Sequence, residues 1–261
     1  MTPVEVCQGE GPLVLGLPHT GTWLPEALLV RLNTRGRALS DTDWHIDRLY
    51  DDLCPGVTTV RATFHRYLID ANRDPEGISL YPGQNTTGLV PLTDFDGAPI
   101  WRDPPSQAEI AARRGAFHAP YHAALEAEMT RIADRHGWAI LYDCHSIRAE
   151  IPFLFDGQLP DFNIGTNLST TCDPSIEALV DKTCRAVSGF STALNGRFKG
   201  GWTTRHYGRP DQGWHAIQME LAQRCYLAAE APPWTYDTAK AEALRIPLKD
   251  ILTSLARWRP A

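Results

Sequence analysis

Residues 139–147 read AILYDCHSI, an apolar run that passes directly into polar and titratable side chains. The first four of these residues are typical of a short buried β-strand. The residues that follow them are Asp143, Cys144, His145 and Ser146. In open α/β sheets, ligands bind beyond the carboxyl ends of the strands. The stretch therefore predicts a strand that carries catalytic types of side chain to the edge where a site would form.

Other short segments rich in Val, Ile and Leu repeat this strand pattern along the chain. The predicted strands are residues 12–17, 57–62, 138–143, 162–166 and 215–221. Helical patterns lie between them, at about 106–136, 173–187 and 236–257. Ser106 and Glu109 have the spacing of a capping box, Pro120 predicts a kink in the same helix, and Asp173 is placed to cap the second. Strands that alternate with helices indicate a layered α/β fold with helices on both faces of the sheet.

The composition narrows the classes of function. The formal net charge is −6 and no block of Lys or Arg occurs, which argues against a nucleic-acid partner. A small acidic substrate remains compatible, because a few arginines in a cleft attract it whatever the total charge. No apolar run approaches the roughly 18 residues that span a membrane, and no signal-peptide pattern opens the chain. The expectation is a cytoplasmic protein, monomeric or a small homo-oligomer, without a membrane partner.

The organisation of the chain suggests a single domain over residues 1–261. Six cysteines occur without a CxxC pair, so neither a zinc ribbon nor a disulfide framework is predicted. The longest irregular stretch is about 74–105, which is dense in Gly, Pro, Asn and Asp. Because loops of that length inside compact domains are usually functional or disordered, we interpret it as a loop over the active-site face.

Two histidines and a carboxylate stand at the ends of separate predicted strands. His19 follows the first strand, His145 follows 138–143, and Glu220 lies near the end of 215–221. Either histidine alone is as readily a hydrogen-bonded structural residue, but together they suit a catalytic metal, which uses three protein ligands and leaves one position open. A third ligand is sought in DTDWHID, residues 41–47, where Asp43 and Asp47 would share one face of a helix. We prefer Asp47, which apolar residues bracket, with Asp43 as the alternative.

A second set of polar residues follows the strand at 57–62. Arg66, Asp70, Asn72 and Arg73 lie in FHRYLIDANRD, residues 64–74. The planar fork of Arg73 suits a carboxylate, Asn72 can add an amide donor, and Asp70 can fix one arginine. The alternative is a cluster of ion pairs on the surface.

Nucleophilic catalysis is disfavoured by the local sequence. Cys144 and His145 are adjacent on a strand and so point to opposite faces, whereas Asp143 points to the same side as His145 and can orient it. Ser146 has no G-x-S-x-G elbow around it. His118 and His122 have i, i+4 spacing without the glutamate of a zinc helix, and we interpret them as structural or rim residues.

The chain resembles the N-formylglutamate amidohydrolase family over nearly its whole length. The motifs that carry the resemblance are PHTG (18–21), DWHID (43–47), HRYLIDANRD (65–74), YDCHSI (142–147), GGWTTRHYG (200–208) and HAIQMELAQRCY (215–226). The family is similar in fold to zinc carboxypeptidases and aspartoacylases, which implies a three-layer αβα sandwich around a mixed, mostly parallel sheet. One position departs from those relatives: Thr22 stands where their His-x-x-Glu motif has its glutamate, and this is a further reason for turning to Asp47.

The resemblance also implies roles for the residues. Asn72 and Arg73 would bind the substrate carboxylate, Arg66 would polarise the scissile carbonyl, and Glu220 would act on the metal-activated water. Apart from the resemblance, Arg205 and His206 follow Gly200 and Gly201 on a predicted loop near the site. They could bind a second carboxylate, although a surface turn explains them equally well.

The activity that the resemblance implies is hydrolysis of N-formyl-L-glutamate to formate and L-glutamate, the last step of a histidine-degradation route. It would use one divalent ion, zinc or another such as cobalt, bound by His19, Asp47 and His145. Two alternatives stay open at this point. One is cleavage of a different N-acyl acidic amino acid or peptide, as in aspartoacylases and carboxypeptidases. The other is a non-catalytic module that binds acidic metabolites.

Overall fold

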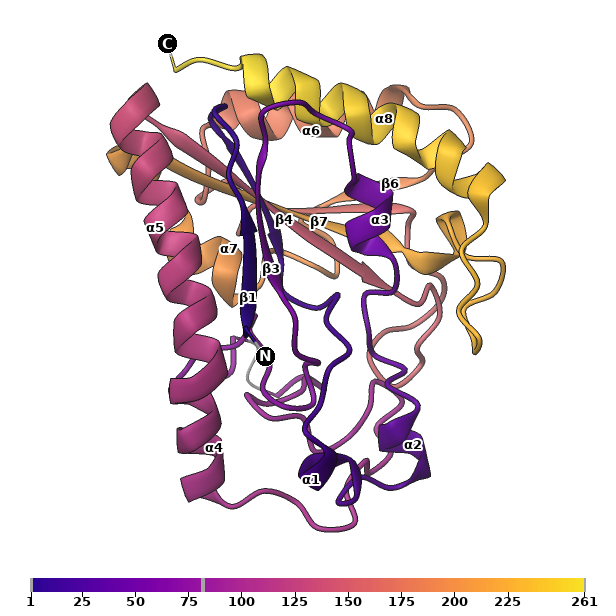
Figure 1. Ribbon diagram of the computed structural model, residues 1–261. Helices are drawn as coiled ribbons and strands as arrows, with labels where there is room; N and C mark the ends of the chain where they lie inside the picture. Colours follow the sequence, from indigo (N-terminus) through magenta and orange to yellow (C-terminus); the bar gives the residue numbers. More distant parts are fainter. Residues whose placement is uncertain (1, 81–82, 261) are drawn as a thin grey trace.

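The computed structural model describes residues 2–80 and 83–260, and in these residues the chain forms one seven-stranded sheet (Figure 1). The order of the strands across the sheet is β1-β3-β2-β4-β7-β5-β6. Their bounds are β1 Val4–Cys7, β2 Leu13–Leu17, β3 Thr58–Ala62, β4 Ala139–Ile147, β5 Phe162–Gly165, β6 Thr192–Leu194 and β7 Trp214–Ala222. The sheet is mixed and mostly parallel, since only the β1/β3 and β5/β7 pairs run antiparallel in the described residues.

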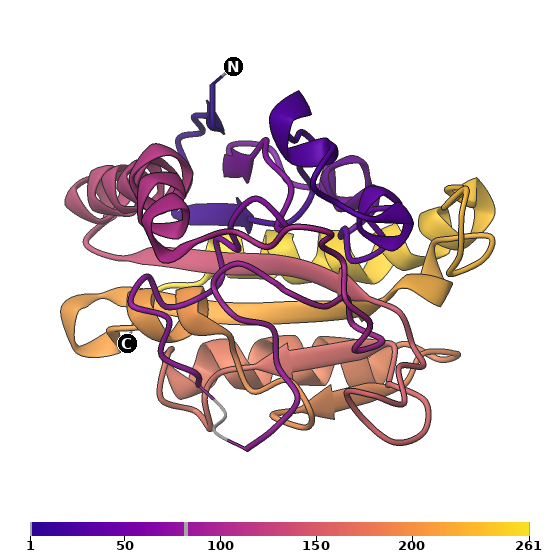
Figure 2. The same ribbon diagram turned by 90° about the horizontal axis from the view of Figure 1, so that it is seen from below.

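The helices cover both faces of this sheet, as the alternation of patterns predicts (Figures 1 and 2). The helix bounds are α1 Glu26–Leu29, α2 Thr34–Arg37, α3 Ile46–Tyr50, α4 Gln107–Arg113, α5 Ala119–His136, α6 Pro174–Ala186, α7 Trp202–Tyr207 and α8 Thr238–Arg257. One core layer joins the sheet to α3, α6 and α8, and the other joins it to α5 and α7. The predicted three-layer αβα sandwich is confirmed.

The central strands β4 and β7 position the site. Each has nine residues, and their parallel register places His145 beside Glu220 and Asp143 beside Gln218. Side chains alternate between the two faces of a strand, so all four of these residues lie on one side of the sheet. Figure 2 shows the two long strands side by side.

The structure corrects the predicted elements in three places. Strand β4 extends to Ile147, so His145 lies within the strand and not beyond it. The edge strands β1 and β6 were not predicted. The disturbance expected at Pro120 takes the form of a π-helical turn, Arg114–His118, immediately before α5. The capping box of Ser106 and Glu109 and the cap at Asp173 are both present.

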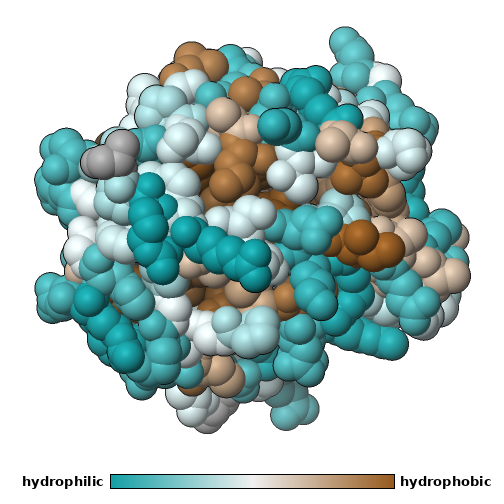
Figure 3. Space-filling view, turned by 90° about the horizontal axis from the view of Figure 1, so that it is seen from above, coloured by the Kyte–Doolittle hydropathy of each residue, from teal (hydrophilic) through white to brown (hydrophobic). Residues whose placement is uncertain are grey.

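The surface over α6 and α8 is mostly hydrophilic, with separate hydrophobic patches (Figure 3). Among the helices formed by residues 2–80 and 83–260, none combines the length and the apolar composition needed to cross a membrane. Between β3 and α4, the described part of the stretch 74–105 carries isolated β-bridges and no helix or longer strand.

Candidate metal and substrate site

Two buried histidines come together at one edge of the sheet. His19 follows β2 in a turn and His145 lies in β4, and each is only 2% exposed. Because β2 and β4 pair in parallel, the residues at and beyond their carboxyl ends meet on the same edge. The centroids of the two rings are 5.0 Å apart. His19 thus lies just beyond the end of β2, as predicted, whereas His145 lies two residues before the end of β4.

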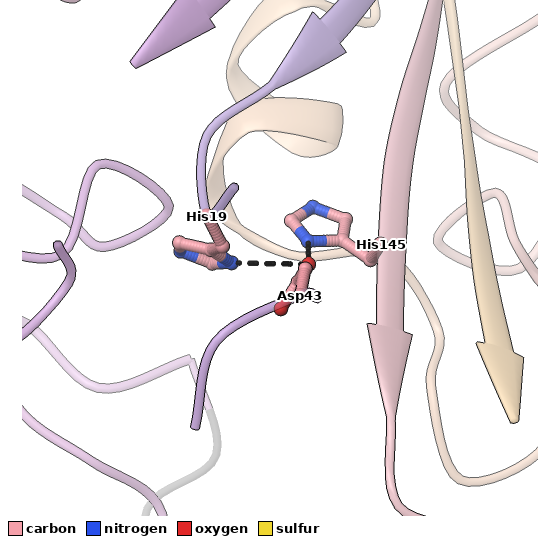
Figure 4. A group of neighbouring side chains, drawn as sticks. All are labelled: His19, Asp43 and His145. Atoms are coloured by element: carbon pink, nitrogen blue, oxygen red, sulfur yellow. Dashed lines mark hydrogen bonds and ion pairs between the residues drawn. The ribbon is translucent and has the colours of Figure 1, made fainter. Parts of the chain in front are cut away.

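Asp43 completes a group of three possible metal ligands (Figure 4). Its Oδ2 atom lies 3.1 Å from His145 Nδ1 and 3.7 Å from His19 Nδ1. Its backbone N–H donates to the carbonyl of His19, which ties the Asp43 loop to the turn after β2. Within the described part of the chain, these three residues form the one group of His, Cys, Asp or Glu side chains whose ligand atoms all lie within 4.8 Å of one another.

The outer nitrogen of each histidine lies beside a carboxylate. His19 Nε2 is hydrogen-bonded to Asp70 Oδ1 at 2.7 Å. His145 Nε2 lies 3.1 Å from Asp143 Oδ1 and also 3.1 Å from Asn72 Nδ2. This leaves both Nδ1 atoms directed at Asp43, and His19 Nδ1 has no hydrogen-bond partner although it is buried. Carboxylate–histidine pairs of this kind orient the ligands in metal sites. Two imidazoles and a carboxylate are donors that zinc accepts, so the residues fit a divalent ion.

The electrostatics of the site follow from this crowding of charges. Burial alone would raise the pKa of Asp43, but hydrogen bonds and charge from His145 and His19 hold it well below the usual value. Burial alone would lower the pKa of His145, but Asp143 and Asp43 raise it well above the usual value. The lowered pKa of Asp43 favours its carboxylate, and the raised pKa of His145 favours its protonated ring. A bound cation would take the place of the positive charge beside Asp43.

Asp47 does not join this group, which corrects the preferred choice of third ligand. Its side chain is 43% exposed, and its Oδ2 atom is 3.5 Å from Arg61. The argument for Asp47 assumed a helix that includes both aspartates. Helix α3 begins only at Ile46, and His45 before it is left-handed with φ 58°, so Asp43 and Asp47 share no helix face. The geometry therefore favours Asp43, the alternative ligand.

The three-residue group adjoins a pocket of about 280 Å³. The predicted site residues that line this pocket are His19, Arg66, Asn72, Arg73, His145 and Glu220. Arg66 is buried and holds Asp70 through two nitrogens, with Nη2 2.7 Å and Nε 3.2 Å from Oδ2. Its Nη1 also lies 3.8 Å from Asp43 Oδ1, so Arg66 stands next to the metal group.

Asn72 and Arg73 occupy a firmly held turn. Asn72 accepts a hydrogen bond from the Thr203 N–H, and its Nδ2 atom is 3.1 Å from His145 Nε2. Arg73 donates to the carbonyl and the hydroxyl of Thr87, both at 2.9 Å. These contacts place the two residues in the pocket wall, in orientations that the surrounding backbone fixes.

His118 and His122 hold the same turn from behind. His118 Nε2 lies 3.0 Å from the carbonyl of Arg73, and His122 Nε2 lies 2.7 Å from the carbonyl of Ala71. These two carbonyls flank Asn72 in the chain. The structural role predicted for this histidine pair agrees with their position.

Glu220 lies buried on β7 with its carboxyl group in the pocket wall. Burial raises its pKa to about 8, an effect that the positive charge of His145 partly offsets. Gln218 donates to Glu220 Oε2 at 3.0 Å and accepts from the Gly201 N–H at 2.6 Å. Sequence reasoning missed Gln218, although its i, i+2 spacing from Glu220 on a strand puts both on one face.

Neither Arg205 nor His206 lines the pocket. Arg205 Nε donates to the carbonyl of Gly200 at 2.9 Å, and the ring of His206 stacks on Trp202 with centroids 4.4 Å apart. Two other cations, Arg197 and Lys199, do line it, and they were not predicted. Their only signal in the sequence is their nearness to the glycine pair of the GGWTTRHYG motif, since Lys199 directly precedes it and Arg197 stands two residues earlier.

Cys144 lies in the core beneath α6 and α8, on the opposite side of β4 from His145. Burial raises the pKa of its thiol well above the usual value, so a thiolate nucleophile is disfavoured here.

The fold and the site together define an α/β protein with a buried His-Asp-His group beside a pocket lined by cations. The sequence profile of N-formylglutamate amidohydrolase matches residues 11–227. The chain belongs to this family, which confirms the resemblance read from its motifs.

Individual relatives agree with this assignment. The chain is 45% identical over 256 residues to an N-formylglutamate deformylase of Pseudomonas aeruginosa, covering 96% of this chain and 95% of the relative. The identity to an N-formylglutamate deformylase of Pseudomonas putida is 43%, with coverage of 96% and 94%. Among solved structures, an N-formylglutamate amidohydrolase of Ralstonia eutropha JMP134 aligns with a TM-score of 0.83 and 27% identity, over 98% of this chain and 97% of that one. A gene product of Agrobacterium tumefaciens, with a TM-score of 0.72 and 16% identity over 98% and 95%, shares the fold.

Proposed function

We propose that this protein hydrolyses N-formyl-L-glutamate to formate and L-glutamate with the help of one divalent metal ion, zinc or another such as cobalt. The observation that carries the proposal is the convergence of His19 Nδ1 and His145 Nδ1 on Asp43, with a carboxylate beside the outer nitrogen of each ring. Membership of the family and the names of the Pseudomonas relatives support the substrate.

His19, Asp43 and His145 would hold the ion. A divalent ion bound there supplies Lewis acidity and lowers the pKa of a coordinated water to about 7. Asp70 and Asp143 keep the two imidazoles oriented with Nδ1 toward the ion. In this account Asp43 would provide the carboxylate that the glutamate of the His-x-x-Glu motif provides in zinc carboxypeptidases and aspartoacylases, which would compensate for Thr22.

Glu220 is placed to move the proton. A carboxyl group with a pKa of about 8 can exist in both protonation states near neutral pH, and a nearby cation shifts it toward the carboxylate. Glu220 would take a proton from the attacking water and later give it to the nitrogen of the leaving glutamate. Gln218, held by the backbone of Gly201, fixes the orientation of that carboxyl group.

The arginines bind and polarise the substrate. Arg66, fixed by its two bonds to Asp70, would donate to the formyl oxygen as negative charge develops on it. Asn72 and Arg73 would bind the α-carboxylate. In this account the reaction is the last step of a histidine-degradation route, as the family resemblance implies.

Release of formate tests the proposal. The protein is prepared once without metal and once with zinc or cobalt restored, and each sample is assayed with N-formyl-L-glutamate and with N-acetyl-L-glutamate. We expect turnover that depends on metal and prefers the formyl group. Preferred cleavage of the acetyl compound would point to an aspartoacylase-like activity. Absence of turnover with every metal would point to a binding protein.

A further inference from the structure

Residues 197–201 lie between β6 and α7 and form part of the pocket wall, and the side chains of Arg197 and Lys199 have no role in the reaction described above. All five line the same pocket as His19, His145 and Glu220. The segment includes Arg197 and Lys199, so two cationic residues stand in the wall of the pocket that His19 and His145 also line. These side chains are partly buried and therefore partly shielded from water.

The end of this segment is fixed against the site. Gly200 has φ +103°, a conformation that other residues rarely adopt. A Cβ atom on Gly201 would lie 2.5 Å from Asn72 Nδ2, so only glycine allows the chain to pass this close to Asn72. The Gly201 N–H also donates to Gln218 at 2.6 Å. Arg197 and Lys199 are therefore carried on backbone that is anchored at the site.

The two cations lack anionic partners within the described residues. Arg197 donates to the carbonyl of Leu154 at 3.1 Å and to the side-chain oxygen of Gln84 at 3.0 Å, and both acceptors are neutral. No ion pair in residues 2–80 and 83–260 includes Arg197 or Lys199. Arg66, by contrast, is already paired with Asp70. A partly buried cation without a counter-charge gains from an anionic ligand, and an arginine fork suits a carboxylate.

We propose that Arg197 and Lys199 bind the distal carboxylate of the substrate and so set the preference for N-formylated acidic amino acids over neutral ones. This inference rests on the proposed function, which supplies a substrate with two carboxylates. The formyl group is assigned to the metal group and Arg66, and the α-carboxylate to Asn72 and Arg73. Besides Arg66 and Arg73, the Lys and Arg residues in the described pocket wall are Arg197 and Lys199. They replace Arg205 and His206, the residues that the sequence suggested for this role.

The test compares two substrates of nearly equal shape, N-formyl-L-glutamate and N-formyl-L-glutamine, which differ in the charge of the distal group. The variants are Arg197→Gln, Lys199→Gln and their combination, with Arg205→Gln as the matched control. We expect Arg197→Gln to lower kcat/KM for the glutamate compound by about tenfold to a hundredfold, from the usual strength of charged hydrogen bonds. The glutamine compound should change by less than about twofold, and Arg205→Gln should leave the ratio of the two unchanged. Arg197→Lys, which keeps the charge, should restore part of the preference.

A binding measurement separates this inference from the proposed function. The metal-loaded proteins are titrated by calorimetry with L-glutamate and with L-glutamine, which requires no turnover. Wild type should bind L-glutamate the more tightly, and Arg197→Gln with Lys199→Gln should abolish the difference while thermal unfolding shows an intact fold. If wild type released no formate but showed this pattern, the proposed function would fail and the subsite would stand. If the preference for glutamate survived in the double variant, or was lost in Arg205→Gln instead, the subsite would be overturned.

Discussion

Replacing His65 with Asn should make the stability of the protein less sensitive to acid. His65 is fully buried beside Arg66, and its Nδ1 atom accepts a hydrogen bond from the Tyr67 N–H at 3.1 Å. Its Nε2 atom lies 3.0 Å from the hydroxyl of Thr42. A second ring proton would have to sit on Nδ1, where it would face the N–H of Tyr67. Burial, together with the charge of Arg66, lowers the pKa of His65 to about 3.

The sign and size of the effect follow from linkage between protonation and folding. In the unfolded chain His65 takes up a proton below about pH 6.5, whereas the folded protein takes it up only near pH 3. The unfolded state therefore binds more protons in this window, and stability is lost as the pH falls through it. Between pH 7 and pH 5 the loss from this one histidine amounts to about 2 kcal/mol, at roughly 1.4 kcal/mol per pH unit below the unfolded pKa. The total free energy of unfolding of a typical domain is about 5–15 kcal/mol.

The assay is equilibrium unfolding in urea, followed by tryptophan fluorescence at pH 7 and pH 5 for wild type and His65→Asn. The Asn side chain can keep the bond from Tyr67 but does not titrate. The variant is expected to be less stable than wild type at pH 7, because it loses the contact with Thr42. At pH 5 the difference between the two proteins in the free energy of unfolding should be smaller by about 2 kcal/mol. Other titrating groups act on both proteins and cancel in the comparison. A difference in the free energy of unfolding that is the same at both pH values would refute the reasoning about His65.

Three further predictions concern the reaction. Glu220→Gln should keep its metal and bind substrate nearly as before, while kcat falls by about 10²–10⁴; loss of the metal would make Glu220 a ligand. Gln218→Leu should lower kcat with little change in KM or metal content, because it frees the carboxyl group of Glu220, and an unchanged kcat would remove Gln218 from the account. Arg73→Ala should lower kcat/KM by about tenfold to a hundredfold, and the loss should shrink for a substrate whose α-carboxylate is amidated. An equal loss on both substrates would limit Arg73 to support of the fold.

The elements that the sequence predicts are those whose side chains carry a strong burial pattern. β2, β4 and β7 are buried along almost their whole length and have the apolar composition that marks central parallel strands. The edge strands β1 and β6 escape notice because β1 is largely exposed and β6 has three residues. An exposed or very short edge strand needs no hydrophobic pattern, since its partner strand defines it.

The residues of the candidate site likewise differ: local sequence predicts some of them, and long-range packing determines the others. That His19 and His145 lie close together could be predicted, because a position near the carboxyl end of a strand is a local property of the chain. The choice between Asp43 and Asp47 depends on the left-handed backbone of His45, which starts α3 three residues after Asp43, and no spacing pattern shows this. The presence of Arg197 in the pocket depends on packing between segments far apart in sequence, so residue type alone could not reveal it.

The central claim is that His19, Asp43 and His145 bind the metal on which hydrolysis depends. Elemental analysis and formate release, measured on the same preparations of wild type, Asp43→Asn and Asp47→Asn, test this claim most directly. We predict about one divalent ion per chain and full activity for wild type and Asp47→Asn, and loss of both for a folded Asp43→Asn protein. An Asp43→Asn protein that kept its metal and its turnover would contradict the assignment, most clearly if Asp47→Asn had lost them.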